Sequence, residues 1–184
     1  MARLDAVADL TERHDLDLGA VVIEAIADQV ALAESRSIDL GLVASSQRVP
    51  FVGSGRELRI MLGNLIDNAV KYTPQDGTVD VGLSCDGGKA TIEVWDTGPG
   101  LDPALTTRVF DRFFRAADAD IEGSGLGLAV AQAIATRHEM VISVANREDR
   151  SGLRVTVSGP TELSGRLDGG HAAVALARDP SSID

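Results

Sequence analysis

Three polar residues recur at helical spacing in the segment from residue 64 to residue 73. Asn64, Asn68 and Lys71 are four and three positions apart, and residues at these intervals lie one above another on a helix. The apolar residues between them can pack inward, which leaves two amides and an ammonium facing a common cleft. Amide oxygens are ligands for a hard cation, and an ammonium attracts phosphate. A solvated helix face has the same pattern, so this segment alone leaves both interpretations open.

A second candidate segment runs from Asp96 to Gly100, directly after a predicted strand. Its two glycines, Gly98 and Gly100, permit a tight backbone path and a close approach to a ligand. The carboxylate of Asp96 can accept a hydrogen bond from an exocyclic amine such as that of adenine. An ordinary turn uses the same residue types, so the segment indicates a nucleotide site only together with other signals.

Three of the four phenylalanines of the chain lie within residues 110–115. The small, polar segment 116–122 follows them, and hydrophobic anchors beside a pliable segment are typical of a lid over a ligand. From such a lid Arg115, and also Arg112, would reach a terminal phosphate. The alternative is a small hydrophobic cluster beneath a loop.

Glycines alternate at positions 123, 125 and 127, where a predicted helix begins. A glycine-rich helix N-terminus exposes backbone N–H groups and the positive end of the helix dipole, which together bind phosphate. The spacing is superficially that of a dinucleotide fingerprint. We discount that interpretation because the segment does not follow a strand within a βαβ unit.

These four segments must be positioned by a larger set of elements. Apolar residues at helical spacing predict three helices, over residues 18–33, 54–71 and 125–139. Alternating or β-rich runs predict six strands, over residues 38–43, 49–52, 78–85, 90–95, 141–145 and 153–157. This order of elements predicts an α/β fold in which one mixed sheet carries helices on one face, with the strands 78–85 and 90–95 at its centre.

The composition limits the class of protein. With 184 residues, 44% of them hydrophobic, the chain is long enough for one sizeable core. Its 17 basic and 28 acidic residues give a formal charge of −11, which disfavours nucleic acid as a partner but is compatible with a nucleotide. The single cysteine, Cys85, makes no intrachain disulfide, and neither a membrane span nor a signal peptide is evident. We therefore expect a cytoplasmic segment without membrane contact.

In order and spacing, the four segments together resemble the N, G1, F and G2 boxes of sensor histidine kinases, which are members of the GHKL ATPase superfamily. The resemblance covers about residues 15–160. It implies the Bergerat fold, a two-layer α/β sandwich whose mixed, mostly antiparallel sheet is covered on one face by three helices. It also implies that ATP and Mg²⁺ are bound between the helices and a flexible lid. Residues 1–14 would then be the remnant of a preceding helical hairpin, and residues 161–184 a flexible tail.

The resemblance implies roles for individual residues. Asn68 would be the metal ligand, Asn64 a second polar group near the metal or the phosphates, and Lys71 a phosphate contact. Asp96 would accept the hydrogen bond from the adenine amine, and Arg115 would join Asn64 and Lys71 as a catalytic residue. The ATP site implied in this way comprises Asn64, Asn68, Lys71, Tyr72, Asp96, Gly98, Gly100, Arg115, Gly123, Gly125, Leu126 and Gly127.

The amide of Asn64 has a mechanistic consequence. It occupies the place where ATP-hydrolysing relatives such as gyrase have a glutamate that activates water, and an amide cannot accept that proton. A neutral imidazole brings its own nucleophilic lone pair, so a kinase directed at histidine can depend on positioning and charge stabilisation instead of a strong base. The sequence therefore predicts transfer of the γ-phosphoryl group with low intrinsic hydrolysis.

The phosphoacceptor histidine of the family has no good candidate in the sequence. In the family it lies on a helical hairpin, in a His-Glu or His-Asp box that is followed by a proline. The one comparable pair, His14-Asp15, has no proline before Pro50. We therefore expect the acceptor on a dimerisation domain, either in a longer protein anchored in the inner membrane or on a separate subunit. A response regulator would be an indirect partner in two-component signal transduction.

Two other functions remain open at this stage. An anti-sigma-factor serine kinase is a compact GHKL relative, but the run from Lys71 to Thr73 and the segment 110–115 favour the histidine-kinase branch. A non-catalytic module that uses nucleotide only to control docking is disfavoured by the intact Asn68, Lys71 and Asp96 and by the glycines. Phosphoryl transfer to histidine, to serine or to neither separates the three.

One short segment departs from the family pattern. His138-Glu139-Met140 stands where the family commonly has His-Gly-Gly, so the form of the turn into the next strand is left open. His138 itself is expected at the end of the third helix, where a hydrogen-bond donor suits the helix dipole.

Overall fold

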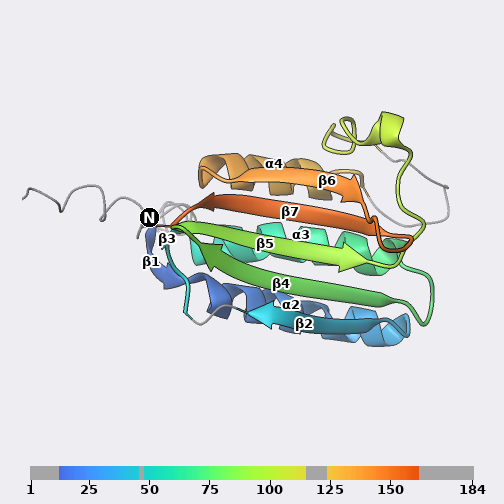
Figure 1. Ribbon diagram of the computed structural model, residues 1–184, viewed down its shortest axis with the longest axis horizontal. Helices are drawn as coiled ribbons and strands as arrows, with labels where there is room; N and C mark the ends of the chain where they lie inside the picture. The colour runs from blue at the N-terminus through green and yellow to red at the C-terminus, as the bar shows by residue number, and fades with distance from the viewer. Residues whose placement is uncertain (1–12, 46–47, 115–123, 162–184) are drawn as a thin grey trace, which may run out of the picture.

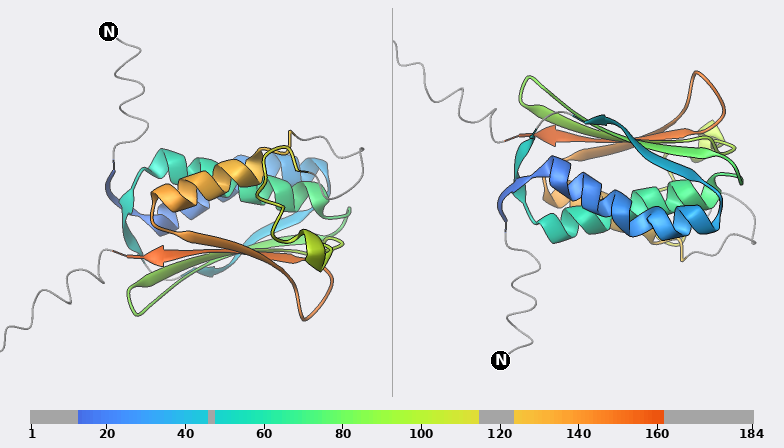
Figure 2. Two further views of the ribbon diagram at one scale, coloured as in Figure 1. Left: turned by 90° about the horizontal axis from the view of Figure 1, so that it is seen from above. Right: turned by 90° about the horizontal axis from the view of Figure 1, so that it is seen from below.

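Three long helices form one layer of the molecule, and a five-stranded sheet forms the other (Figure 1). The computed structural model describes residues 13–45, 48–114 and 124–161. Its helices are α2 (Leu18–Ser35), α3 (Gly55–Tyr72) and α4 (Gly127–Arg137). All three lie on the same face of the sheet, as Figure 2 shows from two sides. The predicted two-layer α/β sandwich is thus confirmed.

The large sheet is mixed. Its strands are β2 (Asp39–Ser45), β4 (Thr78–Asp86), β5 (Lys89–Asp96), β6 (Val141–Asn146) and β7 (Leu153–Pro160). They lie in the order β2-β4-β5-β7-β6 (Figure 1). β2 runs parallel to β4, and the other three pairs are antiparallel. The mostly antiparallel sheet is therefore confirmed, with β5 at its centre and β4 beside it, as predicted.

The prediction of a single sheet is wrong in one respect. The predicted strand near residue 50 forms as β3 (Pro50–Gly53), but it pairs antiparallel with β1 (His14–Asp17) in a separate two-stranded sheet. β1 was not predicted because three of its four residues are polar and no apolar alternation marks it. The carboxylate of Asp17, at the end of β1, connects the start of α2 to the segment before β3. Its Oδ1 accepts hydrogen bonds from the N–H groups of Gly19 and Val49, both at 3.0 Å.

Helix α3 begins and ends as its sequence predicts. Ser54 is the N-cap, and its hydroxyl accepts a hydrogen bond from the Glu57 N–H at 3.3 Å. The helix ends at Tyr72 because Pro74 follows the cap residue Thr73 and cannot continue it.

Helix α4 is shorter at both ends than the predicted range 125–139. Gly125 has a φ of +69° and Glu139 a φ of +58°, and both are left-handed conformations outside a helix. After the cap residue His138, Glu139 N–H donates to Thr136 O at 3.1 Å and Met140 N–H to Ala135 O at 2.8 Å. These two bonds make a Schellman turn, so the turn forms with glutamate where glycine is favoured.

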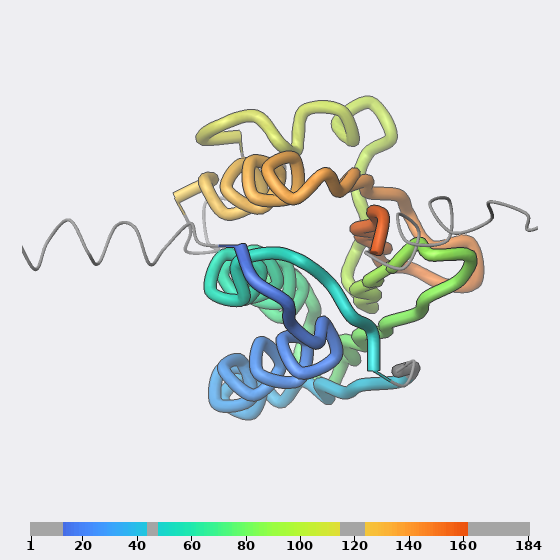
Figure 3. Tube along the Cα trace, turned by 90° about the vertical axis from the view of Figure 1, so that its left-hand side faces the viewer, coloured from blue at the N-terminus to red at the C-terminus, as the bar shows by residue number. Residues whose placement is uncertain are grey.

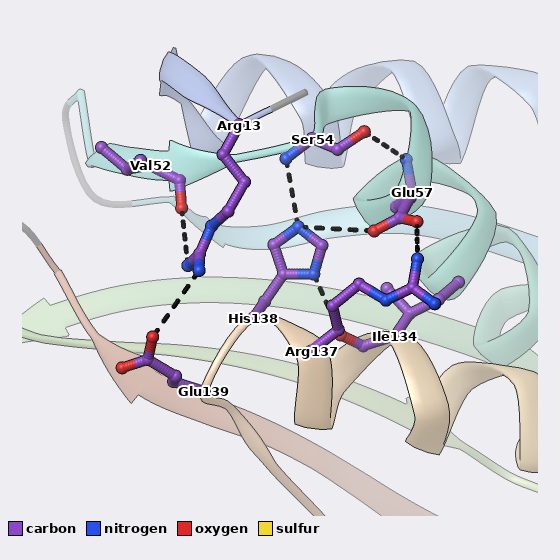
Figure 4. A network of polar contacts seen from close by, with 8 residues as sticks. All are labelled: Arg13, Val52, Ser54, Glu57, Ile134, Arg137, His138 and Glu139. Carbon is purple, nitrogen blue, oxygen red and sulfur yellow. Dashed lines mark hydrogen bonds and ion pairs between the residues drawn. The ribbon is translucent and has the colours of Figure 1, made fainter. Parts of the chain in front are cut away.

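His138 ends α4 and is buried, with 2% of its surface exposed. Its Nε2 accepts a hydrogen bond from Ser54 N–H at 3.1 Å, and its Nδ1 lies 2.9 Å from Ile134 O. Since Nε2 acts as acceptor, the proton resides on Nδ1, which donates to the carbonyl. Figure 4 shows how the imidazole thereby joins the end of α4 to the beginning of α3, with Glu57 and Arg137 paired beside it.

The core lies between the helix layer and the sheet. Helix α3 is the middle helix, with α2 and α4 on either side (Figure 3). Its inward residues recur at three- and four-residue spacing and are at most 2% exposed, namely Leu58, Met61, Leu62, Leu65 and Ile66. The sheet contributes alternate residues such as Val79, Val81, Ile92 and Val94. Within the described ranges, no helix combines the length and apolar character needed to cross a membrane.

Candidate functional site

A cavity of about 210 Å³ opens between α3, the start of α4 and the ends of strands β5, β6 and β7. Four of the predicted segments meet at this cavity, because residues from α3, the loop after β5, the segment before α4 and the phenylalanine-rich region all contribute to its wall. The lining residues are Asn64, Leu65, Asp67, Asn68, Ala69, Lys71, Tyr72, Asp96, Pro99, Gly100, Leu101, Val109, Phe114, Ser124, Gly125, Gly127, Leu128, Val144, Leu153 and Val155.

The polar face of α3 lies along one wall of the cavity. Asn64 and Asn68 both line it, and the Nδ2 of Asn64 donates to Ile60 O at 2.9 Å. This bond leaves Oδ1 of Asn64 directed toward the start of α4. There it lies 3.1 Å from the place that a Cβ on Gly127 would take. The glycine therefore permits α4 to begin close against α3.

Lys71 lines the cavity as an ion pair. Its Nζ lies 2.7 Å from Oδ2 of Asp67, and each side chain keeps 29% of its surface exposed. Asp67 also lines the cavity, although it was not among the site residues predicted from the sequence. Its position four residues before Lys71 is the spacing of a helical ion pair, so that spacing was the available signal.

Asp96 is the buried carboxylate of the site, with 5% of its surface exposed. Its Oδ1 accepts hydrogen bonds from Gly98 N–H at 2.8 Å and from Leu153 N–H at 3.0 Å. Burial raises the pKa of Asp96 above its ordinary value, while these two bonds and the charge of Arg147 oppose the rise. Both of these bonds from the described residues reach Oδ1, so Oδ2 is the oxygen that could accept a hydrogen bond from a ligand N–H group.

Gly98 and Leu126 are the two predicted residues of the described ranges that do not line the cavity. Gly98 contributes to the site through its backbone N–H, which donates to the carboxylate of Asp96. A Cβ at Gly98 would lie 2.9 Å from Tyr72 O, so the loop after β5 packs tightly against the end of α3. Leu126 is the cap residue of α4, and its carbonyl accepts the bond from Val130 N–H at 2.9 Å.

The segment before α4 meets the phenylalanine-rich region. Phe113 N–H donates to Gly125 O at 2.9 Å, and a Cβ on Gly125 would lie 2.8 Å from the backbone of Phe113. Helix α4 has no side-chain cap at its N-terminus within the described residues. The predicted Arg115, Gly123 and lid segment 116–122 lie outside the residues that the structure describes.

The strand residues on the sheet side of the cavity were not predicted from the sequence. Val144, Leu153 and Val155 on β6 and β7 contribute apolar wall, and the hairpin between these strands contacts the loop after β5. No local motif distinguishes these strand residues from ordinary core residues, since only the folded sheet brings them to Asp96.

The cavity offers oxygen ligands for a hard cation. In the described parts of the chain, no group of three or more His, Cys, Asp or Glu residues is arranged to hold a metal. The amide oxygens of Asn64 and Asn68 and the nearby carboxylate of Asp67 fit Mg²⁺, which prefers oxygen and keeps part of its water shell, rather than a metal that needs nitrogen or sulfur ligands.

The fold and the cavity together define a two-layer α/β domain with a ligand site between its helices and one end of its sheet. Residues 53–163 match the family described as histidine kinase-, DNA gyrase B-, and HSP90-like ATPase. The chain belongs to this family. The resemblance predicted from the four segments is therefore confirmed at this level.

Similar curated proteins are sensor kinases. The sensor protein QseC of Salmonella typhimurium is 33% identical over 158 residues, which cover 86% of this chain and 34% of QseC. The sensor protein kinase PmrB of Pseudomonas aeruginosa is 32% identical over 158 residues, which cover 85% of this chain and 33% of PmrB. The chain thus spans about a third of the length of these relatives.

Solved structures of histidine kinases share the fold. The mycobacterial sensor histidine kinase MprB superposes with a TM-score of 0.70 at 27% identity, over 81% of this chain and 97% of that chain. Full-length ShkA in complex with AMPPNP gives a TM-score of 0.71 at 26% identity, over 81% of this chain and 31% of ShkA.

Proposed function

We propose that this chain is a catalytic domain that binds Mg-ATP and transfers the γ-phosphoryl group to a histidine on another domain. The main support for the proposal is that Asp96 and the polar face of α3 line the same cavity. The loop after Asp96 packs on Tyr72, whereas the start of α4 packs on Asn64. These contacts are eight residues apart on one helix, or about 12 Å, which suits a ligand with a base at one end and phosphates at the other.

Asp96 provides the acceptor for the base. Its Oδ2 would accept the hydrogen bond from the exocyclic amine of adenine, and the apolar wall of Leu101, Val144 and Val155 would contact the ring. Guanine has a carbonyl at the corresponding position, which a carboxylate repels. The family's description as ATPases and the AMPPNP complex of ShkA support adenine as the base.

The start of α4 and the polar face of α3 provide the phosphate end. The first turn of α4, which no side chain of the described residues caps, presents backbone N–H groups and the positive end of the helix dipole. Asn68, with Asn64 beside it, would hold Mg²⁺ through amide oxygens, and the bound ion would neutralise charge on the phosphates. Lys71 would contribute its charge once the triphosphate competes with Asp67. Arg115 and Gly123 remain part of the proposed site.

Transfer to histidine fits the absence of a carboxylate at position 64. A ring nitrogen of the acceptor forms the new bond to the γ-phosphorus, and the bond from that phosphorus to the ADP oxygen breaks. ADP leaves with the electron pair, and the imidazole releases one proton to solvent. The chain has only to hold the phosphates in line and stabilise their charge.

The acceptor would lie on a dimerisation domain outside the described fold. His138 is excluded because it is buried and both of its ring nitrogens are hydrogen-bonded. The backbone of His14 belongs to β1, rather than to the helical hairpin on which the family carries its acceptor. Within this proposal the domain works in the cytoplasm, and a response regulator receives the phosphoryl group from the acceptor histidine.

The proposal is tested by incubating the chain with radiolabelled Mg-ATP and purified dimerisation domains of sensor kinases. We expect an acid-labile, base-stable phosphoryl label on a histidine of such a domain, and no label with the Asn68→Ala variant. Acid-stable label on serine would instead indicate a serine kinase. Binding of ATP without transfer to any acceptor would overturn the catalytic part of the proposal.

A further inference from the structure

The loop after β5 is held from outside by the hairpin that joins β6 and β7. Asn146, the last residue of β6, accepts a hydrogen bond from Leu101 N–H through Oδ1 at 2.7 Å. It also donates through Nδ2 to Leu101 O at 2.7 Å. The carboxamide thus satisfies both backbone groups of Leu101, as a neighbouring strand would.

Three more residues of the same hairpin contact this loop or Asp96, the last residue of β5 before it. Ser151 Oγ donates to Gly98 O at 2.7 Å, and Arg147 Nη1 donates to Asp96 O at 3.3 Å. Leu153 N–H donates to the Asp96 carboxylate at 3.0 Å. We call this set of four hairpin residues the β6–β7 clamp: Asn146, Arg147, Ser151 and Leu153.

The loop that the clamp holds forms part of the cavity wall. Pro99, Gly100 and Leu101 all line the cavity, and Gly100 has a φ of +79°. A Cβ at Gly100 would lie 2.8 Å from Asn146 Oδ1, so the glycine permits the carboxamide to reach the loop. A backbone with two glycines has many conformations available when it is not restrained. External hydrogen bonds select one of them.

The clamp is not needed to set the register of the sheet. Asn146 pairs with Leu153 in the β6–β7 ladder, and five further residue pairs continue that ladder back to Val141. The Asn146 side chain is exposed and lies at the end of the ladder, so its two bonds add little to the core. Their direct effect is on the conformation of Leu101 and its neighbours.

We propose that Asn146, assisted by Ser151, is a positioning residue that holds the loop 98–101 in the shape that receives the base of the nucleotide. The inference rests on the proposed function, because it assigns the clamp to the adenine end of that site. A loop that is already ordered loses less conformational entropy when a ligand binds, and this increases affinity. In the part of the chain that the structure describes, both hydrogen bonds of the Asn146 side chain go to Leu101. We therefore expect the phosphate end, at the start of α4, not to depend on the clamp.

The test compares the full chain with its Asn146→Ala and Ser151→Ala variants and with a control, Ser143→Ala, which changes an exposed residue on the same strand β6. Titration calorimetry measures ADP, which uses both ends of the site, and inorganic tripolyphosphate, which uses only the phosphate end. Thermal unfolding of the ligand-free chains measures stability. We expect Asn146→Ala to weaken ADP binding by about tenfold and Ser151→Ala by a few-fold. Tripolyphosphate binding and the melting temperature should stay close to those of the control.

Two results would overturn the clamp alone. One is that Asn146→Ala and Ser151→Ala bind ADP as tightly as the wild type. The other is that they lose ADP and tripolyphosphate binding equally together with a large fall in melting temperature, which is the behaviour of a purely structural residue. A wild-type chain that binds neither ATP nor ADP would instead overturn the proposed function, and the clamp with it.

Discussion

The backbone N–H of Ser54 donates a 3.1 Å hydrogen bond to Nε2 of His138, across the gap between the start of α3 and the end of α4. Ser54 is also the N-cap of α3, and both residues are 2% exposed. One imidazole therefore joins the start of α3 to the end of α4 (Figure 4). The cavity is lined by the other ends of these helices, namely the later residues of α3 and the start of α4.

Replacing His138 by alanine should lower the free energy of unfolding by about 2–4 kcal/mol. The change leaves the buried Ser54 N–H without its acceptor and creates a cavity beside Phe51. Urea denaturation measures this, and His138→Gln, which can supply an acceptor oxygen, should lose less. Nucleotide affinity of the folded variant should be preserved, because His138 lies at the opposite end of α4 from Gly127. A loss of less than about 0.5 kcal/mol would refute the assigned role.

Replacing Glu139 by glycine should stabilise the chain by up to about 1 kcal/mol. Glu139 has a left-handed φ of +58° at the position after the α4 cap, where glycine is free of strain. The variant also removes the ion pair with Arg13, which is long at 3.6 Å and exposed and so contributes little. The matched control is Glu139→Ala, which removes the same ion pair but keeps the strain. Thermal unfolding should rank glycine above both wild type and alanine, and equal melting of the glycine and alanine variants would contradict the prediction.

The pH dependence of stability should carry a contribution from Asp96. Its pKa is raised in the folded state above the ordinary value of 3.8, so the folded chain binds the proton more tightly than the unfolded chain. The contribution of Asp96 therefore favours the folded state at low pH and is lost as pH rises through the folded pKa. Asp96→Asn removes the titrating group and the cost of burying its charge. The ligand-free variant should therefore be at least as stable as wild type at pH 7.

The measurement is urea denaturation of wild type and Asp96→Asn between pH 4 and pH 7. Other carboxylates, such as Asp149 beside Arg147, have lowered pKa values and act in the opposite direction. The difference between the two chains isolates Asp96. The prediction is contradicted if the difference in free energy of unfolding between the two chains does not change with pH, or changes with the opposite sign. Burial would then not raise the pKa of Asp96.

Replacing Asn64 by glutamate should raise the rate of ATP hydrolysis about tenfold or more. The Asn64 Oδ1 points toward the start of α4, and a carboxylate there can accept the proton of an attacking water. Release of inorganic phosphate without any acceptor domain measures the rate, with Asn64→Gln as the uncharged control. If wild type already hydrolyses ATP rapidly, position 64 does not decide between transfer and hydrolysis.

Local sequence signals predicted where helices and strands form better than they predicted which strands pair. The cap at Ser54, the proline after α3 and the turn between β4 and β5 are set by neighbouring residues. The pairing of β3 with β1 was missed because it joins residues such as Asp17 and Pro50, which are far apart in the sequence and meet only in the folded chain. The early end of α4 was missed because glutamate rarely adopts the conformation that Glu139 has.

The candidate site shows the same division. The α3 face, Asp96 and the glycines could be predicted because each belongs to a motif with its own spacing. Asn146 and Ser151 could not, since they come from another hairpin, 45 and 53 positions from Leu101 and Gly98. Residues that hold a loop through hydrogen bonds from a distant part of the chain do not belong to a local sequence motif.

Binding of Mg-ATP in this cavity is tested most directly by calorimetric titration of the wild-type chain with ATP, with and without Mg²⁺, beside Asp96→Ala and Asn68→Ala. We expect wild type to bind ATP, and to bind it more tightly with Mg²⁺. Asp96→Ala should abolish binding, and Asn68→Ala should bind weakly and no longer respond to the metal. An ATP affinity that is unchanged in Asp96→Ala would show that the nucleotide does not bind in this cavity.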